Sequence, residues 1–332
     1  MVKRVLITGG TGFIGSALAR RLIANDVTPV RLLGRDFSRS GALPTSGVEA
    51  VSADLRDAPK VLEACRNVDT VFHIGALSSP WAAGGKREFY DVNVTGTDNV
   101  LEGCRKMGVR RMVYVSSPSV VFDGQDHQNL TEDAPYPKRF ASAYSWSKKI
   151  GEDRVNAAAQ AGLETIILRP KAVFGPGDTS LLPRLLTAAA AGRLPQIGNG
   201  GNKVDLTYVD NVIEALCLSQ AASERALGRT YTITGGESAA LWGVIGHLLR
   251  SVGLSDRLRR IPVRAALVAA GLMEARAALL RREPLLTRYS ALILARTQTY
   301  DISAARELLG YKPVVTLADG IERTIASLRQ TR

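Results

Sequence analysis

The sequence predicts an α/β protein in which a doubly wound parallel sheet over residues 1–175 precedes a smaller, mostly helical lobe over residues 176–332. Short runs of β-branched and aliphatic residues alternate with helix-period segments through the first part. This repeated β–α order requires a parallel sheet with helices on both faces. A glycine-rich loop follows the first run, and the alternation stops after Gly175-Pro-Gly177.

Hydrophobic periodicity gives the expected elements in order. Strands are expected at residues 4–8, 30–33, 70–74, 112–116 and 165–169, with one more short strand before Asp54. Helices are expected at residues 13–25, 58–66, 90–107 and 142–161. The second part should hold a helix near 180–191, a strand pair around 195–207, a helix at 209–220, a strand at 230–234 and then mostly helix. The chain could cross back to the sheet between residues 205 and 235.

The composition is that of a globular chain and argues against several function classes. The 332 residues are 45% hydrophobic and 22% charged, which is enough to bury a large core. The net charge is +12, but no run of five Lys and Arg residues occurs and only 6% of residues are aromatic, so nucleic-acid binding is not expected. The cysteines and histidines lack metal-ligand spacing, so no metal site is expected. A strand pattern begins at Lys3 with no leader segment before it, which favours the cytoplasm.

The glycine-rich loop after the first expected strand predicts a dinucleotide site. Gly9, Gly12 and Gly15 are three residues apart and open the first expected helix. Glycines at these positions let the backbone approach a pyrophosphate, whose charge the helix N-terminus stabilises.

Arg35 lies 20 residues beyond Gly15, directly after the second strand. A basic side chain there accommodates the 2′-phosphate of NADP, whereas an acidic one would select NAD. We therefore favour NADP, with NAD still possible, because the strand is expected to end at Gly34 and Arg35 is the first side chain to face the ribose. Asp36 lies beside Arg35, and Arg39 is near in sequence. A solvated Arg-Asp pair on the surface is the alternative. Asp54 and Leu55 are expected to flank the adenine, although Asp54 could equally cap the next helix.

Tyr144 and Lys148 are four residues apart in an expected helix and therefore share one face. A phenol has a pKa near ~10, and a cation ~4 Å away at an effective dielectric of ~20 stabilises the phenolate by about 4 kcal/mol. We therefore expect Lys148 to lower the pKa of Tyr144 toward neutrality, which would make it a proton-transfer group. Ser117, just after the fourth strand, could hydrogen-bond the substrate oxygen, a role for which Ser116 and Ser119 compete.

Seven segments carry a resemblance to a known family: Thr8–Gly15, His73-Ile-Gly-Ala76, Asp91-Val-Asn-Val-Thr-Gly-Thr97, Ser116-Ser117, Tyr144-x-x-x-Lys148, Leu168-Arg-Pro170 and Phe174-Gly-Pro-Gly177. Together they resemble the extended short-chain dehydrogenases/reductases, a Rossmann-fold family, over essentially the whole chain. The resemblance implies that Ser117, Tyr144 and Lys148 form the catalytic triad and that Lys148 also holds the nicotinamide ribose. It implies that Asn93 supports the active-site helix and its proton relay. The coenzyme contacts that it implies are Gly9, Thr11, Gly12, Phe13, Ile14, Gly15, Ile74, Gly75, Ala76, Val115, Pro170, Ala172 and Val173; at residue 75 alanine is commoner.

The downstream sequence is similar to one branch of this family, the 3β-hydroxysteroid and sterol-4-carboxylate dehydrogenases and the bacterial 2-alkyl-3-oxoalkanoate reductases. The similarity lies in residues 175–183, 198–211, 300–301 and 309–313. It implies an NAD(P)H-dependent enzyme that interconverts a ketone and a secondary alcohol on a hydrophobic 3-oxo or 3-hydroxy substrate.

Two alternatives remain: a sugar-nucleotide epimerase or dehydratase of the same family, and a non-catalytic protein that senses the coenzyme. Val204 stands where sugar-nucleotide members usually carry an arginine for the substrate pyrophosphate. A sensing protein usually lacks the Tyr-Lys pair. The resemblance also implies a homodimer formed through the helices near 90–107 and 142–161.

Two expected helices at residues 262–280 and 284–296 are apolar nearly all round, with arginines interspersed. Such helices must be covered by the core, a partner subunit, a lipid surface or an apolar substrate. Their longest apolar stretch has nine residues, 265–273, so any membrane contact is expected to be peripheral. The residues expected to line a substrate pocket are Ser78, Trp81, Ser119, Phe174 and Leu181. A substrate carboxylate would be held by Lys171 or by one of the arginines.

Overall fold

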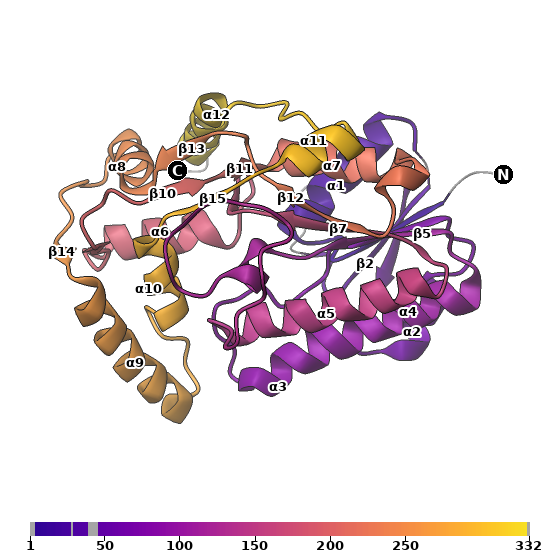
Figure 1. Cartoon of the computed structure of the whole chain (residues 1–332), viewed down its shortest axis with the longest axis horizontal. Coiled ribbons are helices and arrows are strands. Elements are labelled where there is room, and N and C mark those ends of the chain that lie inside the picture. The colour runs from indigo at the N-terminus through magenta and orange to yellow at the C-terminus, as the bar shows by residue number, and fades with distance from the viewer. Residues whose placement is uncertain (1–3, 28, 39–45, 331–332) are drawn as a thin grey trace.

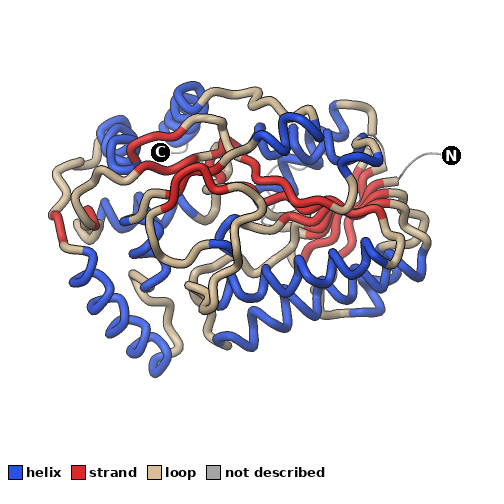
Figure 2. The backbone as a smooth tube through the Cα atoms, in the orientation of Figure 1, coloured by secondary structure: helices blue, strands red, loops and turns tan. Residues whose placement is uncertain are grey.

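The computed structural model, which describes residues 4–27, 29–38 and 46–330, is built around a seven-stranded parallel sheet (Figure 1, Figure 2). The strands in spatial order are β12 (Arg229–Ile233), β7 (Glu164–Pro170), β5 (Arg111–Val115), β4 (Thr70–His73), β1 (Val5–Thr8), β2 (Val30–Gly34) and β3 (Val48–Ser52). The order reverses between β1 and β4, which is the switch point where ligands of open α/β sheets bind. The predicted doubly wound fold is confirmed.

Helices cover both faces of this sheet because its strands are apolar on both sides. In β1, Val5 and Ile7 belong to one core cluster, and Leu6 between them belongs to the cluster on the opposite face. The helices over the first cluster are α1 (Phe13–Ala24), α7 (Val209–Ala221) and α11 (Ser303–Leu309). Those over the second are α2 (Ala58–Ala64), α4 (Gly96–Met107) and α5 (Ala143–Gln160), which lie below the sheet in Figure 1.

A smaller lobe forms around a four-stranded sheet. Its strands in order are β13 (Ser238–Ala240), β10 (Lys203–Asp205), β15 (Gln298–Tyr300) and β6 (His127–Leu130). Two short pairs join β8 (Val173–Phe174) to β11 (Thr207–Tyr208) and β9 (Gln196–Ile197) to β14 (Arg260–Ile261). The helices of this lobe are α6 (Leu181–Ala190), α8 (Leu241–Ser251), α9 (Val263–Leu280), α10 (Arg288–Ala295) and α12 (Leu317–Gln330). No helix in the described part of the chain has the length and apolar character needed to span a bilayer.

The two parts of the chain exchange strands. β12 comes from beyond residue 176 and pairs with β7 at the edge of the large sheet. β6 comes from the first part and pairs with β15 in the small sheet. The two sheets are therefore tied together by chain connections in both directions.

Several element boundaries differ from the expected ones. The helix expected at 90–107 begins earlier, as α3 (Gly85–Tyr90) followed by a π-helical turn (Asp91–Thr95) that leads into α4. The helix expected from Pro284 begins only at Arg288, because Thr287 caps it by accepting a hydrogen bond from the Ser290 N–H at 3.0 Å. β6, β13, β14 and β15 were not expected from the sequence, and the strand pair expected around 195–207 is wrong, because β9 and β10 join different sheets. The described part of the chain also contains short 3₁₀ turns at Pro118–Val121 and Glu224–Ala226.

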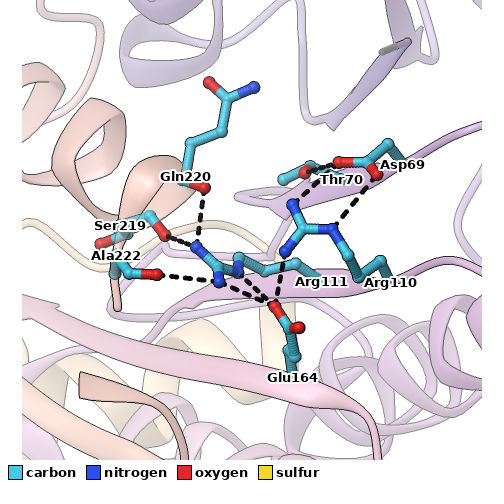
Figure 3. Close-up of polar contacts among 8 residues, drawn as sticks. All are labelled: Asp69, Thr70, Arg110, Arg111, Glu164, Ser219, Gln220 and Ala222. Carbon is cyan, nitrogen blue, oxygen red and sulfur yellow. Dashed lines mark hydrogen bonds and ion pairs between the residues drawn. The ribbon is translucent and has the colours of Figure 1, made fainter. Parts of the chain in front are cut away.

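A cluster of paired charges lies at the amino ends of the central strands (Figure 3). The buried side chain of Arg111 donates from Nε to Glu164 at 2.8 Å and from Nη1 to the Ser219 carbonyl at 3.0 Å, in the last turn of α7. Arg110 donates to Asp69 at 3.0 Å and to Glu164 at 2.6 Å. The cluster thus joins the starts of β4, β5 and β7 to the end of α7.

Candidate active site

The loop between β1 and α1 brings its backbone close to that of the loop after β4. Gly9 has a φ of +69°, and a Cβ added there would lie 2.7 Å from the Cα of Gly75. A Cβ on Gly15 would lie 2.2 Å from the Gly9 carbonyl oxygen. Even a methyl at Gly75 would lie 3.0 Å from the Gly9 nitrogen, so the glycine that replaces the commoner alanine fits this tight contact.

The first turn of α1 is open to an anion. Its N-cap, Gly12, has no side chain to bond the first N–H groups, and no acidic residue lies in that turn. Phe13, Ile14 and Gly15 therefore present backbone donors at the positive end of the helix. Thr11 packs on the end of β2, since a Cβ on Gly34 would lie 2.7 Å from its Cγ2 atom. This cradle fits the pyrophosphate of a dinucleotide.

Charged side chains follow β2 and β3 at the same edge of the sheet. Arg35 is exposed directly after β2, and the carboxylate of its neighbour Asp36 accepts from the Ser38 N–H at 2.9 Å. Asp54 is bound by Arg56 at 2.8 Å, which lowers the pKa of Asp54 to about 2, with a smaller contribution from the Arg35 charge. Leu55 follows and packs near Gly75, whose added Cβ would lie 3.1 Å from its Cδ1 atom. Arg39 lies outside the described residues.

Tyr144, Lys148 and a third residue, Glu152, share one face of α5. The helix starts at Ala143 because Ser142 accepts a hydrogen bond from the Ser145 N–H at 3.0 Å. Glu152 was missed in the sequence, although its spacing of eight residues from Tyr144 puts it on the same face. It is fully buried and accepts from Arg169 at 2.7 Å and from Tyr136.

The expected lowering of the Tyr144 pKa by Lys148 is wrong for this structure. Burial raises the pKa of Tyr144 to about 12; the nearby Ser117 hydroxyl lowers it, and the Glu152 charge raises it further. Burial also lowers the pKa of Lys148 to about 7. The Lys148 ammonium lies over the Tyr114 ring, 3.9 Å from its centroid. Loss of hydration therefore dominates for both groups, an effect that residue spacing does not reveal.

A directional chain of hydrogen bonds joins the end of β1 and the loop after β4 to α4 and the π-helical turn before it. His73 at the end of β4 contacts the Thr8 hydroxyl through Nδ1 at 2.7 Å and the Thr97 hydroxyl through Nε2 at 2.9 Å. Thr97 donates to the Asn93 carbonyl at 2.6 Å, so it accepts from Nε2–H. Thr8 in turn donates to Nδ1 and accepts from the Gly75 N–H at 3.1 Å. Burial, together with the Lys148 charge, lowers the pKa of His73 to about 3, so the ring is neutral at neutral pH.

Asn93 lies in the π-helical turn and joins the loop after β4 to α5. Its side chain accepts from the Leu77 N–H at 2.7 Å and donates to the Ser147 hydroxyl at 2.9 Å. Ser147 in turn donates to the Tyr144 carbonyl at 2.8 Å. This geometry is suited to positioning α5, and π-helical turns are often found at functional sites.

The residues expected near the coenzyme and the substrate fall into two groups. We call the face of α5 that carries Tyr144 and Lys148 the catalytic face. The first group lies at the carboxyl edge of the large sheet: Ile74 and Ala76 after β4, Val115 and Ser117 at the end of β5, Pro170 at the end of β7, and Ala172 and Val173 beyond it. Ser117 accepts from the Ser119 N–H at 3.2 Å. In the described residues the buried hydroxyls of Ser116 and Ser119 have no partner at normal hydrogen-bond distance.

The remaining substrate candidates are more scattered. Ser78 is exposed and Trp81 half-buried in one loop, and α6, which begins at Leu181, reaches this loop through Arg184, which donates to Ser79 at 3.3 Å. Phe174 is buried in the core against the Tyr208 ring and is not brought to the others.

Lys171 is also occupied within the protein. Its buried ammonium donates to Gln298 at 2.7 Å, and burial lowers its pKa to about 8.

Tyr289 of α10 reaches the catalytic face from the small lobe and was missed in the sequence. Burial raises its pKa, the Tyr144 phenol raises it further, and the Ser119 hydroxyl lowers it. Its ring packs edge-on against Phe122 with centroids 6.4 Å apart. No local pattern could have found it, because the contact joins residues far apart in the sequence.

Known proteins resemble this chain over nearly its whole length. The chain is 38% identical over 331 residues to a 2-alkyl-3-oxoalkanoate reductase of Stenotrophomonas maltophilia (98% of this chain, 99% of the relative). It is 31% identical over 340 residues to the mouse sterol-4-alpha-carboxylate 3-dehydrogenase (99% of this chain, 92% of the relative).

Among solved structures, a dTDP-glucose 4,6-dehydratase from Streptomyces venezuelae with NAD bound superposes with a TM-score of 0.79 at 27% identity, covering 99% of this chain and 98% of the other. The sequence pattern of the 3-beta hydroxysteroid dehydrogenase/isomerase family matches residues 6–263. This chain therefore belongs to the 3-beta hydroxysteroid dehydrogenase/isomerase family, within the extended short-chain dehydrogenases/reductases.

Proposed function

We propose that the chain is an NADPH-dependent oxidoreductase that interconverts a ketone and a secondary alcohol on a hydrophobic 3-oxo or 3-hydroxy substrate of the 2-alkyl-3-oxoalkanoate or 3β-hydroxysteroid type. The observation that carries the proposal is the closeness of the Ser117 hydroxyl to the Tyr144 phenol, with Lys148 one helical turn further along the same face of α5. The names of the relatives support the substrate class, since both describe chemistry at C3 of an apolar molecule.

The roles of the residues follow from their environments. The bound coenzyme would exchange hydride with the carbonyl carbon of the substrate. Tyr144 would exchange the proton with the substrate oxygen, and Ser117 would donate a hydrogen bond to that oxygen. With a pKa of about 12 the phenol is protonated at neutral pH, the form that donates a proton during ketone reduction. Lys148, whose ammonium has no ion pair among the described residues, would bond the nicotinamide ribose.

The preference for NADPH rests on Arg35. Its guanidinium is exposed at the end of β2, where a 2′-phosphate would lie, and the neighbouring Asp36 carboxylate is engaged by Ser38. NAD is the alternative, since related structures contain it.

Two other functions are less well supported. A sugar-nucleotide epimerase or dehydratase would need a cation for the substrate pyrophosphate, and Val204 at the corresponding position is buried in β10. A non-catalytic coenzyme sensor does not need the Ser117, Tyr144 and Lys148 set that this chain retains.

The test is coenzyme consumption by the full chain with a substrate panel. The panel holds long-chain 2-alkyl-3-oxoacids, 3-ketosteroids, hydroxyflavanones and nucleotide sugars, each with NADPH and with NADH. We expect NADPH-dependent reduction of an oxoacid or a ketosteroid. Conversion of a nucleotide sugar without net consumption of coenzyme would contradict the proposal.

A paired measurement tests the coenzyme preference. Arg35→Ser should raise the KM for NADPH at least ~10-fold, because a charge-assisted contact to the phosphate is lost, and should leave the KM for NADH nearly unchanged. Arg105→Ser, an exposed arginine at the far end of α4, is the matched control. Equal changes in the KM for NADPH and the KM for NADH would show that Arg35 does not contact the 2′-phosphate.

A further inference from the structure

Exposed apolar side chains are concentrated on one segment of the molecule. Among the described residues ten large apolar side chains are exposed, and six of them lie between residues 268 and 285. These six are Val268, Leu272, Met273, Leu279, Leu280 and Leu285. Exposed apolar residues that stand singly need no explanation, but a contiguous group marks an interaction surface.

The helix α9 has two different faces. Its buried residues are Ala266, Ala270 and Ala277, which share the side that packs toward α10. Val268, Leu272 and Leu279 follow at spacings of four and seven residues on the opposite side and are 65%, 70% and 84% exposed. Eighteen residues make a helix about 27 Å long, and α9 runs away from the body at the lower left of Figure 1 with α10 beside it.

Unpaired positive charge borders this apolar stripe. Arg264 and Arg276 lie on its two flanks, and Arg281 and Arg282 follow the end of the helix; all four are exposed. None of these arginines forms an ion pair within the described parts of the chain. The two acidic residues of the segment are already paired, Glu274 with Arg288 at 2.7 Å and Glu283 with Arg184 at 2.7 Å.

We propose that α9 and the turn that follows it, residues 263–285, form an interfacial surface that docks on an anionic lipid bilayer. The leucines would enter the boundary between headgroups and acyl chains, while the arginines remain at the level of the lipid phosphates. A second copy of the chain fits less well, because two such helices would bring eight unpaired arginines together. A substrate molecule fits less well, because the stripe points away from α10.

The position of this surface gives it a role in catalysis that rests on the proposed function. The neighbouring helix α10 carries Tyr289 toward Tyr144 and Ser119, so docking of α9 would place the smaller lobe and this side of the site near the lipid. An apolar substrate dissolved in the bilayer would then reach the site without crossing bulk water. Lipid binding itself does not depend on which substrate is used.

Vesicle flotation of the full chain, without substrate or coenzyme, tests the surface. We expect binding to vesicles of phosphatidylglycerol and phosphatidylcholine, little binding to pure phosphatidylcholine, and weaker binding at 0.5 M than at ~0.1 M salt because ions screen the arginines. The double variant L272Q/L279Q should lose roughly 10-fold or more in apparent affinity for the vesicles. The reason is that the apolar surface of two leucines would no longer be transferred from water into the bilayer. The variant R276Q/R281Q should lose affinity only for the anionic vesicles.

The matched controls are V314Q and R87Q, which alter an exposed valine and an exposed arginine elsewhere on the surface and should bind as the parent does. A tryptophan placed by L279W should shift its emission to the blue with anionic vesicles. No flotation of the parent, or flotation of L272Q/L279Q equal to it, would overturn the proposal. Two other results would also overturn it. One is a parent protein that is a dimer in solution and that L272Q/L279Q converts to a monomer without any change in lipid binding. The other is binding of the parent to an acidic protein but not to lipid vesicles.

Discussion

The two ends of the central sheet place buried cations in opposite surroundings. At the amino ends, Arg111 donates to Glu164 and to backbone carbonyls at the end of α7, so its charge and its donors are satisfied. At the carboxyl ends, Lys148 lies over a tyrosine ring, and no ion pair is found for it among the described residues. A buried charge without an ion partner is costly to keep. One end of this sheet thus satisfies its buried cation within the protein, and the other keeps a buried cation without an ion partner among the described residues.

The largest expected effect separates chemistry from stability. Tyr144→Phe removes the proton donor and should lower kcat by roughly 10²- to 10⁴-fold. Its urea unfolding midpoint should stay close to that of the parent, because the ring still fills its site. Tyr90→Phe, an exposed tyrosine on α3, is the control. Turnover of Tyr144→Phe at the parental rate would exclude the proposed mechanism.

The converse variant acts at the other end of the sheet. Arg111→Met leaves Glu164 half-paired and several carbonyls without their donor, which should lower the free energy of unfolding by about 3–5 kcal/mol. The kcat of the folded protein should not change, because Arg111 is far from the catalytic face. Arg66→Met, which breaks an exposed ion pair on the surface, should cost at most ~1 kcal/mol. Urea unfolding that matches the parent would show that the cluster does not stabilise the fold.

The unpaired Lys148 predicts how stability depends on pH. Its pKa in the folded protein, about 7, lies below the ordinary value of 10.5. Between these values the unfolded chain binds a proton that the folded chain lacks, so the free energy of unfolding should rise with pH in this window. The rise is on the order of a few kcal/mol, and below pH ~7 this group contributes no further change.

Unfolding of Lys148→Met should therefore depend less on pH between 7 and 10 than unfolding of the parent. Lys149→Met, which removes a half-exposed neighbour paired with Asp153, should keep the parental slope. The same slope in all three proteins would mean that Lys148 keeps its ordinary pKa in solution.

The smallest expected effect concerns the contact between the lobes. Tyr289→Phe removes a polar group near the Tyr144 phenol and Ser119 and should lower kcat/KM by about 3- to 10-fold, the size of one polar contact to a bound substrate. The unfolding midpoint should change little, because the ring keeps its packing on Phe122. Unaltered kinetics on every accepted substrate would place Tyr289 outside the site.

The parts of this molecule that could be predicted from the sequence are those set by local spacing. The glycine loop, the alternation of strands and helices, and the shared face of Tyr144 and Lys148 all depend on residues close in the chain. The pKa of Tyr144 could not be predicted, because it depends on burial and on Glu152 and its partners. Tyr289 and β6 could not be predicted for the same reason, since each acts through a contact with a distant segment.

The exchange of strands between the two sheets limits how this protein can be divided. A fragment ending at residue 175 would leave the β7 edge without β12 and β6 without β15, two open strand edges prone to aggregation. A chimera that joins the smaller lobe of one relative to the coenzyme-binding half of another would therefore have to preserve both strand pairings, β12 with β7 and β6 with β15. Changes within a single helix such as α10 leave both of these strand pairings intact.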